Sequence, residues 1–425
     1  MKKSIILVAC LAFLTAVILY TCSNSGNKTA SLGSILPQSG NGDLITNPSL
    51  NKTNLDATSH GATITFQNIG AAGWYPSRRD PATGPCDVYN SGGCCQTRHN
   101  LTTDSLTPWN EELIMTLRGP MIVKQVAVYQ PNAANKNLWD LVSKWDDTAP
   151  ATLTGIAFKG NNTEANGFQG IVGNTCLVDV STNKKFTVGP GSIPYCPPAS
   201  DTKYYGWEGS KMVIVQAYMP HVSANVIDNA KNCGNDPTNG WYDAPWIGLS
   251  HGEMVRSGAF GSCHCYAKDG AQWWLADGCG QFNAFEVVND NNDYQNFDLF
   301  STNFFGYGGY VGEGPCGKNC NVAGLDPKID LINKATSTEA TTGAISNPTK
   351  GPGAAFRRPA AGYRFFVMLF DVDTRQVQLA LIHPANVPAT VSAVLPGLPQ
   401  QIQRATVNNM LALRLPGPNS VGVIR

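Results

Sequence analysis

The strongest constraint on the fold is a series of short strand-like runs with no helical period between them. Six runs alternate apolar and polar residues or are rich in β-branched residues, at 63–66, 121–129, 211–218, 282–288, 363–371 and 377–382. Loops rich in Gly, Asn, Pro and Ser separate them, and no long segment has apolar residues at a 3.6-residue period. Strands that alternate with turn clusters predict an all-β sandwich.

The charge content excludes several classes of protein. Only 14% of the 425 residues are charged, and the 30 basic residues balance the 30 acidic ones. A nucleic-acid partner would require a basic face, and a coiled coil would require many more charged residues. We therefore expect no nucleic-acid partner. A polar but neutral surface favours hydroxyl-rich ligands such as carbohydrates.

The N-terminus carries an export pattern. Lys2 and Lys3 precede an apolar run from Ile5 to Tyr20, which is typical of a signal peptide. Two alternatives stay open, because the run is almost long enough to span a membrane and Cys22 lies in a weak lipoprotein-like site. Residues 4–22 would form the anchor if no cleavage occurs.

The composition along the chain divides it into four parts. Residues 1–22 are the signal peptide or anchor, and residues 23–60, rich in Ser, Asn, Thr and Gly, predict a linker. Residues 61–385 contain the strand-like runs and form the predicted sandwich domain. Residues 386–425 contain scattered prolines between apolar pairs, and the sequence assigns them no role.

The cysteines agree with export. Of the 13 cysteines, 11 lie beyond the leader, and clustered cysteines in an exported chain predict disulfide-stapled loops. The clustered candidates are Cys86, Cys94, Cys95, Cys263, Cys265, Cys279, Cys316 and Cys320. A zinc site at Cys263, His264, Cys265 and Cys279 is the alternative, although zinc ligands are usually separated by more than one residue.

One strand carries the most informative polar pattern. In a strand over Gly278–Val288, Gln281 and Asn283 face one way, and a bulge before Glu286 would bring its carboxyl to the same face. Sandwich glycosidases present catalytic side chains in this way, and retaining hydrolysis requires two carboxyls about 5 Å apart. The alternative is a half-buried strand whose polar residues merely face outward.

This segment resembles the Gly-Cys-Gly-Glu-Phe-Asp-Ile-Phe-Glu motif of the fungal cell-wall proteins named for the yeast target of the SBF transcription factor. That family is classed with endo-1,3-β-glucanases and is related to laminarinase-type enzymes with a concanavalin-like β-jelly roll. The resemblance therefore implies a β-jelly-roll fold and a β-glucan partner.

Further motifs resemble the same family in the same order, over about residues 65–382. Pro108–Glu112 and Leu117–Pro120 resemble its Pro-Phe-Asn-Glu-Glu and Phe-Arg-Gly-Pro. Ala244–Trp246 followed by Cys263–Tyr266 resembles its Pro-Ala-Trp and Cys-Ser-Cys-Trp, and Phe356–Pro359 resembles its Phe-Glu-Arg-Pro.

The chain departs from the family at the catalytic positions. The resemblance implies that position 281 is the nucleophile and Glu286 the acid/base, but Gln281 and Asn283 stand where the family has acids. An amide cannot be the carboxylate nucleophile. Hydrolysis is therefore doubtful, unless another acid creates an inverting site with Glu286. The acids near enough in sequence are Asp277, Asp290, Asp293 and Asp298.

Several residues near this motif are candidates for sugar contact. Sugar rings stack on aromatic faces, although core packing is the alternative for each ring. The predicted substrate-binding residues are Tyr242, Trp246, His251, Trp273 and Trp274.

Two further patterns are weaker. Gly248-Leu249-Ser250-His251-Gly252 matches the serine-hydrolase elbow, with Asp371 or Asp373 and His383 following, but the elbow requires a strand that enters a helix. Residues 290–293 are oxygen-rich, but they lack the spacing of a calcium loop. We expect no cofactor apart from a weak calcium candidate there.

These patterns lead to one expectation with two alternatives. The chain is predicted to be a secreted or cell-surface protein directed at β-1,3-glucan, similar to a glycoside hydrolase of the glucan endo-1,3-β-glucosidase type. A catalytically silent glucan-binding or structural surface protein is the first alternative, and a serine hydrolase acting through Ser250 is the second.

Overall fold

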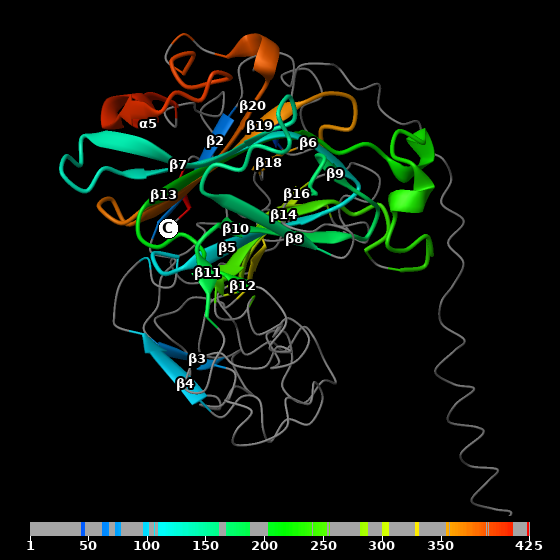
Figure 1. Cartoon of the computed structure of the whole chain (residues 1–425), viewed down its shortest axis with the longest axis horizontal. Coiled ribbons are helices and arrows are strands. Elements are labelled where there is room, and N and C mark those ends of the chain that lie inside the picture. Colours follow the sequence, from blue (N-terminus) through cyan, green and yellow to red (C-terminus); the bar gives the residue numbers. More distant parts are fainter. Residues whose placement is uncertain are drawn as a thin grey trace, which may run out of the picture. The chain divides into compact units, whose positions relative to one another are not determined.

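The computed structural model describes a central part of the chain and several strands outside it (Figure 1). The described residues are 106, 109–160, 167–187, 203–239, 241–252, 255, 281–287, 358–387, 389 and 391–410. The outlying strands lie at 44–46, 62–67, 73–77, 97–101, 300–305, 328–330, 354–356 and 423–424; for these, and for residues 203, 281 and 386, only the backbone is described. All of these elements belong to one compact unit, residues 39–425.

One layer is a seven-stranded antiparallel sheet. In spatial order it consists of β17 (Lys328–Asp330), β16 (Phe300–Phe305), β15 (Gln281–Val287), β14 (Trp246–His251), β5 (Leu113–Arg118), β10 (Leu177–Thr182) and β8 (Ile156–Gly160). Strands β5, β14 and β15 are neighbours although they are far apart in the sequence, so long-range pairing builds the centre of this sheet.

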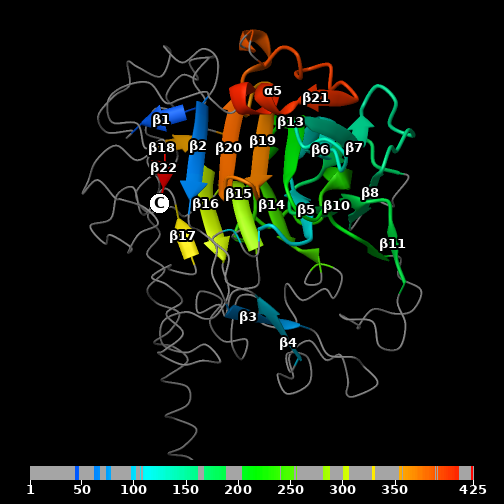
Figure 2. The ribbon, with the colours of Figure 1, turned by 90° about the vertical axis from the view of Figure 1, so that its left-hand side faces the viewer.

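The second layer is a nine-stranded sheet. Its order is β21 (Gln401–Gln403), β7 (Leu138–Asp146), β6 (Met121–Pro131), β13 (Lys211–Tyr218), β19 (Arg364–Asp371), β20 (Gln376–Ile382), β2 (Ala62–Gln67) and β22 (Val423–Ile424), with β9 (Ile171–Val172) also paired to β6. All pairs in this sheet are antiparallel except β2 with β22. Figure 2 shows this layer in front of the strands of the first sheet.

Three two-stranded pairs and short helical segments complete the described structure. The pairs are β1 (Leu44–Thr46) with β18 (Ala354–Phe356), β3 (Gly73–Ser77) with β4 (Thr97–Leu101), and β11 (Lys185–Phe186) with β12 (Lys203–Tyr204). The helical segments are η3 (Val222–Ala224), η4 (Asn229–Lys231), η7 (Pro384–Asn386) and α5 (Arg404–Met410). No helix in the described ranges is long and apolar enough to cross a membrane, and residues 4–22 lie outside those ranges.

The main core lies between the two sheets because alternate residues of each strand point inward. Met115 and Leu117 of β5 contribute from one layer, and Val213 and Val215 of β13 contribute from the other. Full burial of a side chain of this size stabilises the fold by about 1.5–3 kcal/mol. The prediction of an all-β sandwich is confirmed, and each of the six predicted runs coincides with a strand to within a residue or two.

A second apolar core lies on the other side of the nine-stranded sheet. Residues 391–410, which the sequence left without a role, supply the apolar side chains that cover this face. Leu395 and Leu398 belong to this cluster with Trp139 and Met212 of the sheet, and β21 extends the sheet beside β7. This covering layer, residues 391–410, is therefore part of the folded domain.

Candidate functional site

The candidate site lies on strand β15, at an irregularity in its pairing. Gly248 of β14 pairs with Asn283, whereas Ile247 pairs with Phe285, so Ala284 is the extra residue of a bulge. The pairing with β16 shifts at the same place, between Asn283 and Glu286. Ala284 and Phe285 are buried in the core between the sheets. The bulge predicted before Glu286 is thus confirmed.

The bulge brings the side chains of Asn283 and Glu286 into contact on the face away from the core. The Asn283 amide Nδ2 donates a 2.6 Å hydrogen bond to Oε2 of Glu286. The guanidinium Nη2 of Arg118 donates to the other oxygen, Oε1, at 3.0 Å. The Glu286 side chain keeps 18% of its surface exposed. Both carboxylate oxygens therefore already accept N–H groups.

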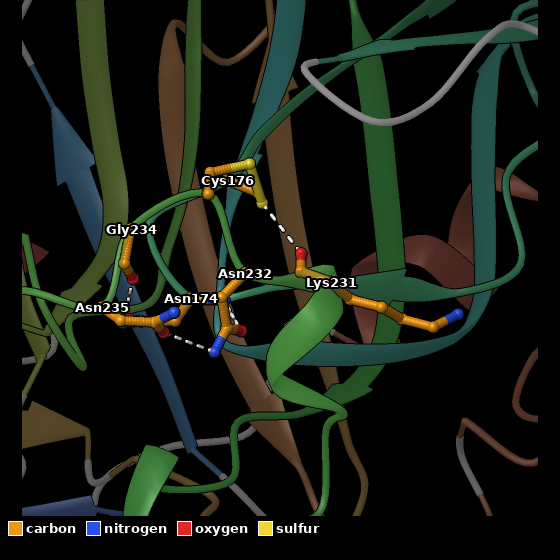
Figure 3. The surroundings of a disulfide bond; sticks show 7 residues. Asn174, Cys176, Lys231, Asn232, Gly234 and Asn235 are labelled. Carbon is orange, nitrogen blue, oxygen red and sulfur yellow. Dashed lines mark hydrogen bonds between the residues drawn. A yellow bond between two sulfur atoms is a disulfide. The ribbon is translucent and has the colours of Figure 1, made fainter.

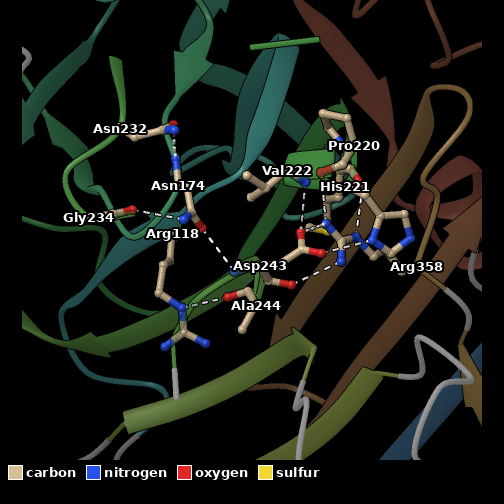
Figure 4. A network of polar contacts seen from close by, with 11 residues as sticks. Arg118, Asn174, Pro220, His221, Val222, Asn232, Gly234, Asp243, Ala244 and Arg358 are labelled. Carbon is tan, nitrogen blue, oxygen red and sulfur yellow. Dashed lines mark hydrogen bonds and ion pairs between the residues drawn. The ribbon is translucent and has the colours of Figure 1, made fainter. Parts of the chain in front are cut away.

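Arg118 connects Glu286 to two tryptophans. It ends strand β5 and lies in one row with Trp246 and Glu286 across three neighbouring strands. Its Nε donates a 2.7 Å hydrogen bond to the carbonyl of Ala244 (Figure 4). The guanidinium carbon lies 5.6 Å from the ring centre of Trp246 and 5.6 Å from that of Trp241. Guanidinium groups at this range are attracted to aromatic rings.

A second polar row runs beside the first. This row crosses four neighbouring strands, and each residue is paired with the next. Its members are Asp179 of β10, Thr116 of β5, Gly248 of β14 and Asn283 of β15. Thr116 Oγ1 donates a 2.7 Å hydrogen bond to Asp179. A Cβ at Gly248 would lie 2.2 Å from the Trp246 indole, so only glycine fits beneath this ring.

Two polar atoms of β14 on this face are buried without a hydrogen-bond partner. They are Nε1 of Trp246 and Oγ of Ser250, and the whole residues are 5% and 0% exposed. A buried polar atom without a partner costs about 1–3 kcal/mol. Such atoms call for an explanation, and a ligand that contacts this strand is one.

The turn before β14 is held by a charged hub around Asp243. The Arg358 Nη2 donates to Asp243 Oδ1 at 2.7 Å, and Nδ1 of His221 lies 2.9 Å from Oδ2 (Figure 4). Burial raises the pKa of Asp243, but the contacts with His221 and Arg358 outweigh this and lower the pKa below its usual value. Asp243 is followed directly by Ala244, the residue whose carbonyl holds Arg118.

A disulfide fixes the loop on the other side of this turn. Cys176 is bonded to Cys233 (Figure 3). Asn174 accepts a 2.9 Å hydrogen bond from the backbone N–H of Asp243 and donates to the carbonyl of Gly234. This disulfide was not among the predicted cysteines. All eight clustered candidates, and the zinc alternative, lie outside the described residues.

The other predicted substrate-binding residues differ in how far they are buried, and some of them lie outside the described residues. His251 is nearly fully buried, and its Nε2 lies 2.8 Å from the carboxylate of Glu111. Tyr242 lies half-buried in the turn before β14. Trp273, Trp274 and the side chain of Gln281 are outside the described residues. A substrate role for each of these residues stays a prediction.

The serine-hydrolase interpretation is wrong. Ser250 lies within β14, which is followed by helical residues at 252 and 255 but is antiparallel to both of its neighbours. The elbow belongs to the parallel sheet of an α/β fold, which is not the sheet found here. Asp371 pairs with Arg404, and Nδ1 of His383 accepts the backbone N–H of Ala385. Neither residue is thereby arranged to activate a serine.

The described residues also constrain an inverting mechanism. Asp179 lies three strand spacings from β15, about 14 Å at the usual separation of neighbouring strands. Inverting glycosidases separate their carboxyls by only about 6.5–9.5 Å. The four acids considered from the sequence, and the calcium candidate at 290–293, lie outside the described residues. Of the ranges that are described, none brings three or more His, Cys, Asp or Glu residues together as metal ligands.

Sequence reasoning missed Arg118, Thr116 and Asp179 as members of this face. Arg118 was visible only as part of a family-like motif. Its contact with Glu286 spans 168 residues of sequence and depends on the register of three strands.

Comparison with known proteins gives two matching family models. The one described as Cell wall protein YJL171C/Tos1, N-terminal, matches residues 62–131. The one described as Cell wall protein YJL171C/Tos1, C-terminal, matches residues 180–315. Arg118 lies in the first match, and Trp246 and Glu286 lie in the second.

One curated relative is also similar. It is named "Probable circularly permuted 1,3-beta-glucanase YJL171C" and comes from Saccharomyces cerevisiae, with 22% identity over 278 residues. The match covers 56% of this chain and 64% of the relative, which is less than two thirds of the relative's length. No solved structure matches the chain.

Proposed function

This chain belongs to the Tos1-type family of fungal cell wall proteins, and from that premise we propose that it binds β-1,3-glucan at the cell surface. The proposed binding surface is the outer face of the seven-stranded sheet around Arg118, Trp246, Asn283 and Glu286, here called the glucan face. Export through residues 1–22 is part of the proposal.

The contact between Asn283 and Glu286 across the bulge carries this proposal. Amide, carboxylate and hydroxyl groups of the two polar rows match the donors and acceptors of a neutral sugar. The name of the yeast relative points to the same polysaccharide class. The partnerless Nε1 of Trp246 and Oγ of Ser250 add one donor and one donor-acceptor group to the same strand.

We propose further that the glucan face does not perform retaining hydrolysis. Position 281 is an amide, which cannot supply the carboxylate nucleophile. A general acid must donate a proton, but both oxygens of Glu286 accept hydrogen bonds from Arg118 and Asn283. We therefore assign Glu286 the role of a hydrogen-bond acceptor for sugar hydroxyls.

The test is an incubation of the purified protein with laminarin, followed by measurement of binding and of new reducing ends. We expect binding without products. Reducing ends that form with the wild type and vanish in Glu286→Ala would establish hydrolysis and contradict the silent site. Absence of any binding would contradict the proposal as a whole and leave a structural wall protein.

A variant in which the carboxyls are restored tests whether their absence explains the proposed lack of hydrolysis. Gln281→Glu combined with Asn283→Asp restores the carboxyls at both positions where the family has acids. We expect this double variant to release reducing ends from laminarin, with Gln281→Glu, Asn283→Asp, Glu286→Ala as the inactive control. A well-folded double variant without activity would show that the missing carboxyls do not explain the silence.

A further inference from the structure

Trp241 differs from every other tryptophan whose side chain the structure describes. It is 55% exposed, whereas the others are at most 5% exposed. The buried ones are Trp109, Trp139, Trp145, Trp207 and Trp246. An indole is a large apolar group whose burial is favourable, so its exposure beside a polar site favours a role in binding.

The exposed ring has one charged neighbour, and its backbone is hydrogen-bonded in a turn. The Arg118 guanidinium that bonds Glu286 also lies over the Trp241 ring. The backbone N–H of Trp241 donates a 2.9 Å hydrogen bond to Oδ1 of Asn239, and the N–H of Tyr242 donates to the carbonyl of the same asparagine. A side chain that is already ordered loses little entropy when a ligand binds.

The same turn is anchored on its other side. Asp243 is bonded by Arg358 and His221, and its N–H donates to Asn174, beside the Cys176–Cys233 disulfide. These contacts hold the backbone of residues 241–243, and the Trp241 ring lies beside the Arg118 guanidinium that contacts Glu286. Figure 4 shows the part of this network that runs from Arg118 through Ala244 to Arg358.

We propose that Trp241 is a stacking platform for a glucose unit of the glucan chain, next to the Arg118–Glu286 contact. This inference rests on the proposed glucan binding. A β-linked glucose carries equatorial hydroxyls and presents axial C–H groups on both ring faces, which match the face of an indole. An α-linked mannose carries an axial hydroxyl on one ring face and an axial glycosidic oxygen on the other, so neither face fits the indole as well, and the platform selects glucan over α-linked mannan.

The test compares the affinity of laminarihexaose for the wild type, Trp241→Ala and Trp241→Phe by calorimetry. We expect Trp241→Ala to weaken binding about tenfold, which corresponds to about 1.4 kcal/mol. Trp241→Phe should remain within about threefold, because an aromatic face is kept. The matched control is Val226→Ala, since Val226 is the other large apolar side chain found exposed in the described residues, at 50%. We expect no effect there.

A second measurement requires no variant. N-bromosuccinimide oxidises exposed tryptophans, and peptide mass spectrometry locates the modified residue. We expect oxidation of Trp241 in the wild type, protection by laminarihexaose and no protection by α-1,6-mannan.

The outcomes separate this inference from the proposed function. Laminarihexaose binding with equal affinity for wild type and Trp241→Ala, and without protection of Trp241, would overturn the platform but leave glucan binding intact. Equal losses in Trp241→Ala and Val226→Ala would also overturn the platform. A wild type that binds neither laminarihexaose nor laminarin would overturn the proposed function, and the platform with it. Equal protection of Trp241 by mannan would overturn its selectivity.

Discussion

The two outer faces of the sandwich differ in what their strands present. The nine-stranded sheet presents apolar side chains such as Trp139, Ile214 and Val367, and residues 391–410 cover them. The seven-stranded sheet presents Thr116, Arg118, Asn283 and Glu286 in or beside two rows. Both faces belong to sheets that share one core, so the core alone does not determine this difference.

We interpret the apolar outer face as the one that stabilises the fold and the polar outer face as the proposed binding face. An apolar outer face must be covered, and the chain uses its own C-terminal segment for this purpose. The glucan face instead retains charged contacts, and the Trp246 indole lies against Gly248. Two of its buried polar atoms, Nε1 of Trp246 and Oγ of Ser250, have no hydrogen-bond partner. Such groups cost stability, and proteins keep such costs mainly at functional sites.

The largest effect is expected on the covered face. Leu395 is 1% exposed in the covering layer, and Leu395→Ala should lower the free energy of unfolding by about 2–5 kcal/mol. Urea unfolding measures the loss, with the exposed Gln400→Ala as the control. Laminarin affinity should not change in the folded variant. A loss below about 1 kcal/mol would show that this layer is not part of the cooperative fold.

On the glucan face, the Arg118–Glu286 contact should matter for both stability and binding. Arg118→Met removes one charge-assisted donor from Glu286 and one from Ala244, which should cost about 2–3 kcal/mol. Adding Glu286→Gln should recover part of this loss, because the carboxylate no longer lacks a partner. Urea unfolding of the two single variants and the double variant measures the coupling. Strictly additive losses would show that the two residues do not interact.

The buried side chain of Lys211 should make the free energy of unfolding depend on pH. Lys211 is fully buried, and its Nζ donates to the carbonyls of Trp109 and Glu111. Burial lowers the pKa of Lys211 to about 7, although the carboxylates of Glu208, Glu112 and Glu111 act in the opposite direction.

The direction of this pH effect follows from proton binding. The unfolded chain keeps the lysine proton up to a pKa of about 10.4, so it binds more protons than the folded chain above pH 7. Stability should therefore rise by about 2 kcal/mol between pH 7 and pH 9. Lys211→Met should lose this rise in urea unfolding at several pH values. An unchanged pH dependence in that variant would assign the effect to another group.

The smallest effect is expected at Ser250. Ser250→Ala removes a buried hydroxyl without a partner, so thermal unfolding should show an unchanged stability or a gain of up to about 1 kcal/mol. Laminarin affinity should fall slightly, because a hydroxyl of the glucan face is lost. A clear loss of stability would mean that the hydroxyl already has a partner in solution.

Much of the fold could be predicted from the sequence because its strands are short and regularly patterned. The β-branched run at 211–218 and the alternation at 121–129 each identified a strand of the nine-stranded sheet. The bulge before Glu286 was also predictable, since Asn283 and Glu286 are both polar at a spacing that a regular strand would place on opposite faces. The covering layer was not, because Pro396 and Pro399 interrupt the apolar residues of 391–410.

The candidate site was predicted in part: Asn283 and Glu286 of β15 and Trp246 of β14 were identified, but the contact of Arg118 with Glu286 was not. Glu286 and Asn283 are three residues apart, but Arg118 reaches Glu286 through the pairing of β5 with β14 and of β14 with β15. The Cys176–Cys233 bond was missed for a similar reason: the two cysteines are 57 residues apart, and neither belongs to a cluster. Contacts of this kind follow from strand register, which one sequence does not specify.

Hydrogen–deuterium exchange with and without laminarihexaose tests the central claim most directly, because it reports on both faces in one experiment. The account predicts slower exchange in peptides of β5, β14 and β15 and in the turn at 239–244, with no change in residues 391–410. Protection confined to residues 391–410 and the nine-stranded sheet, or no protection at a saturating concentration of laminarihexaose, would contradict it.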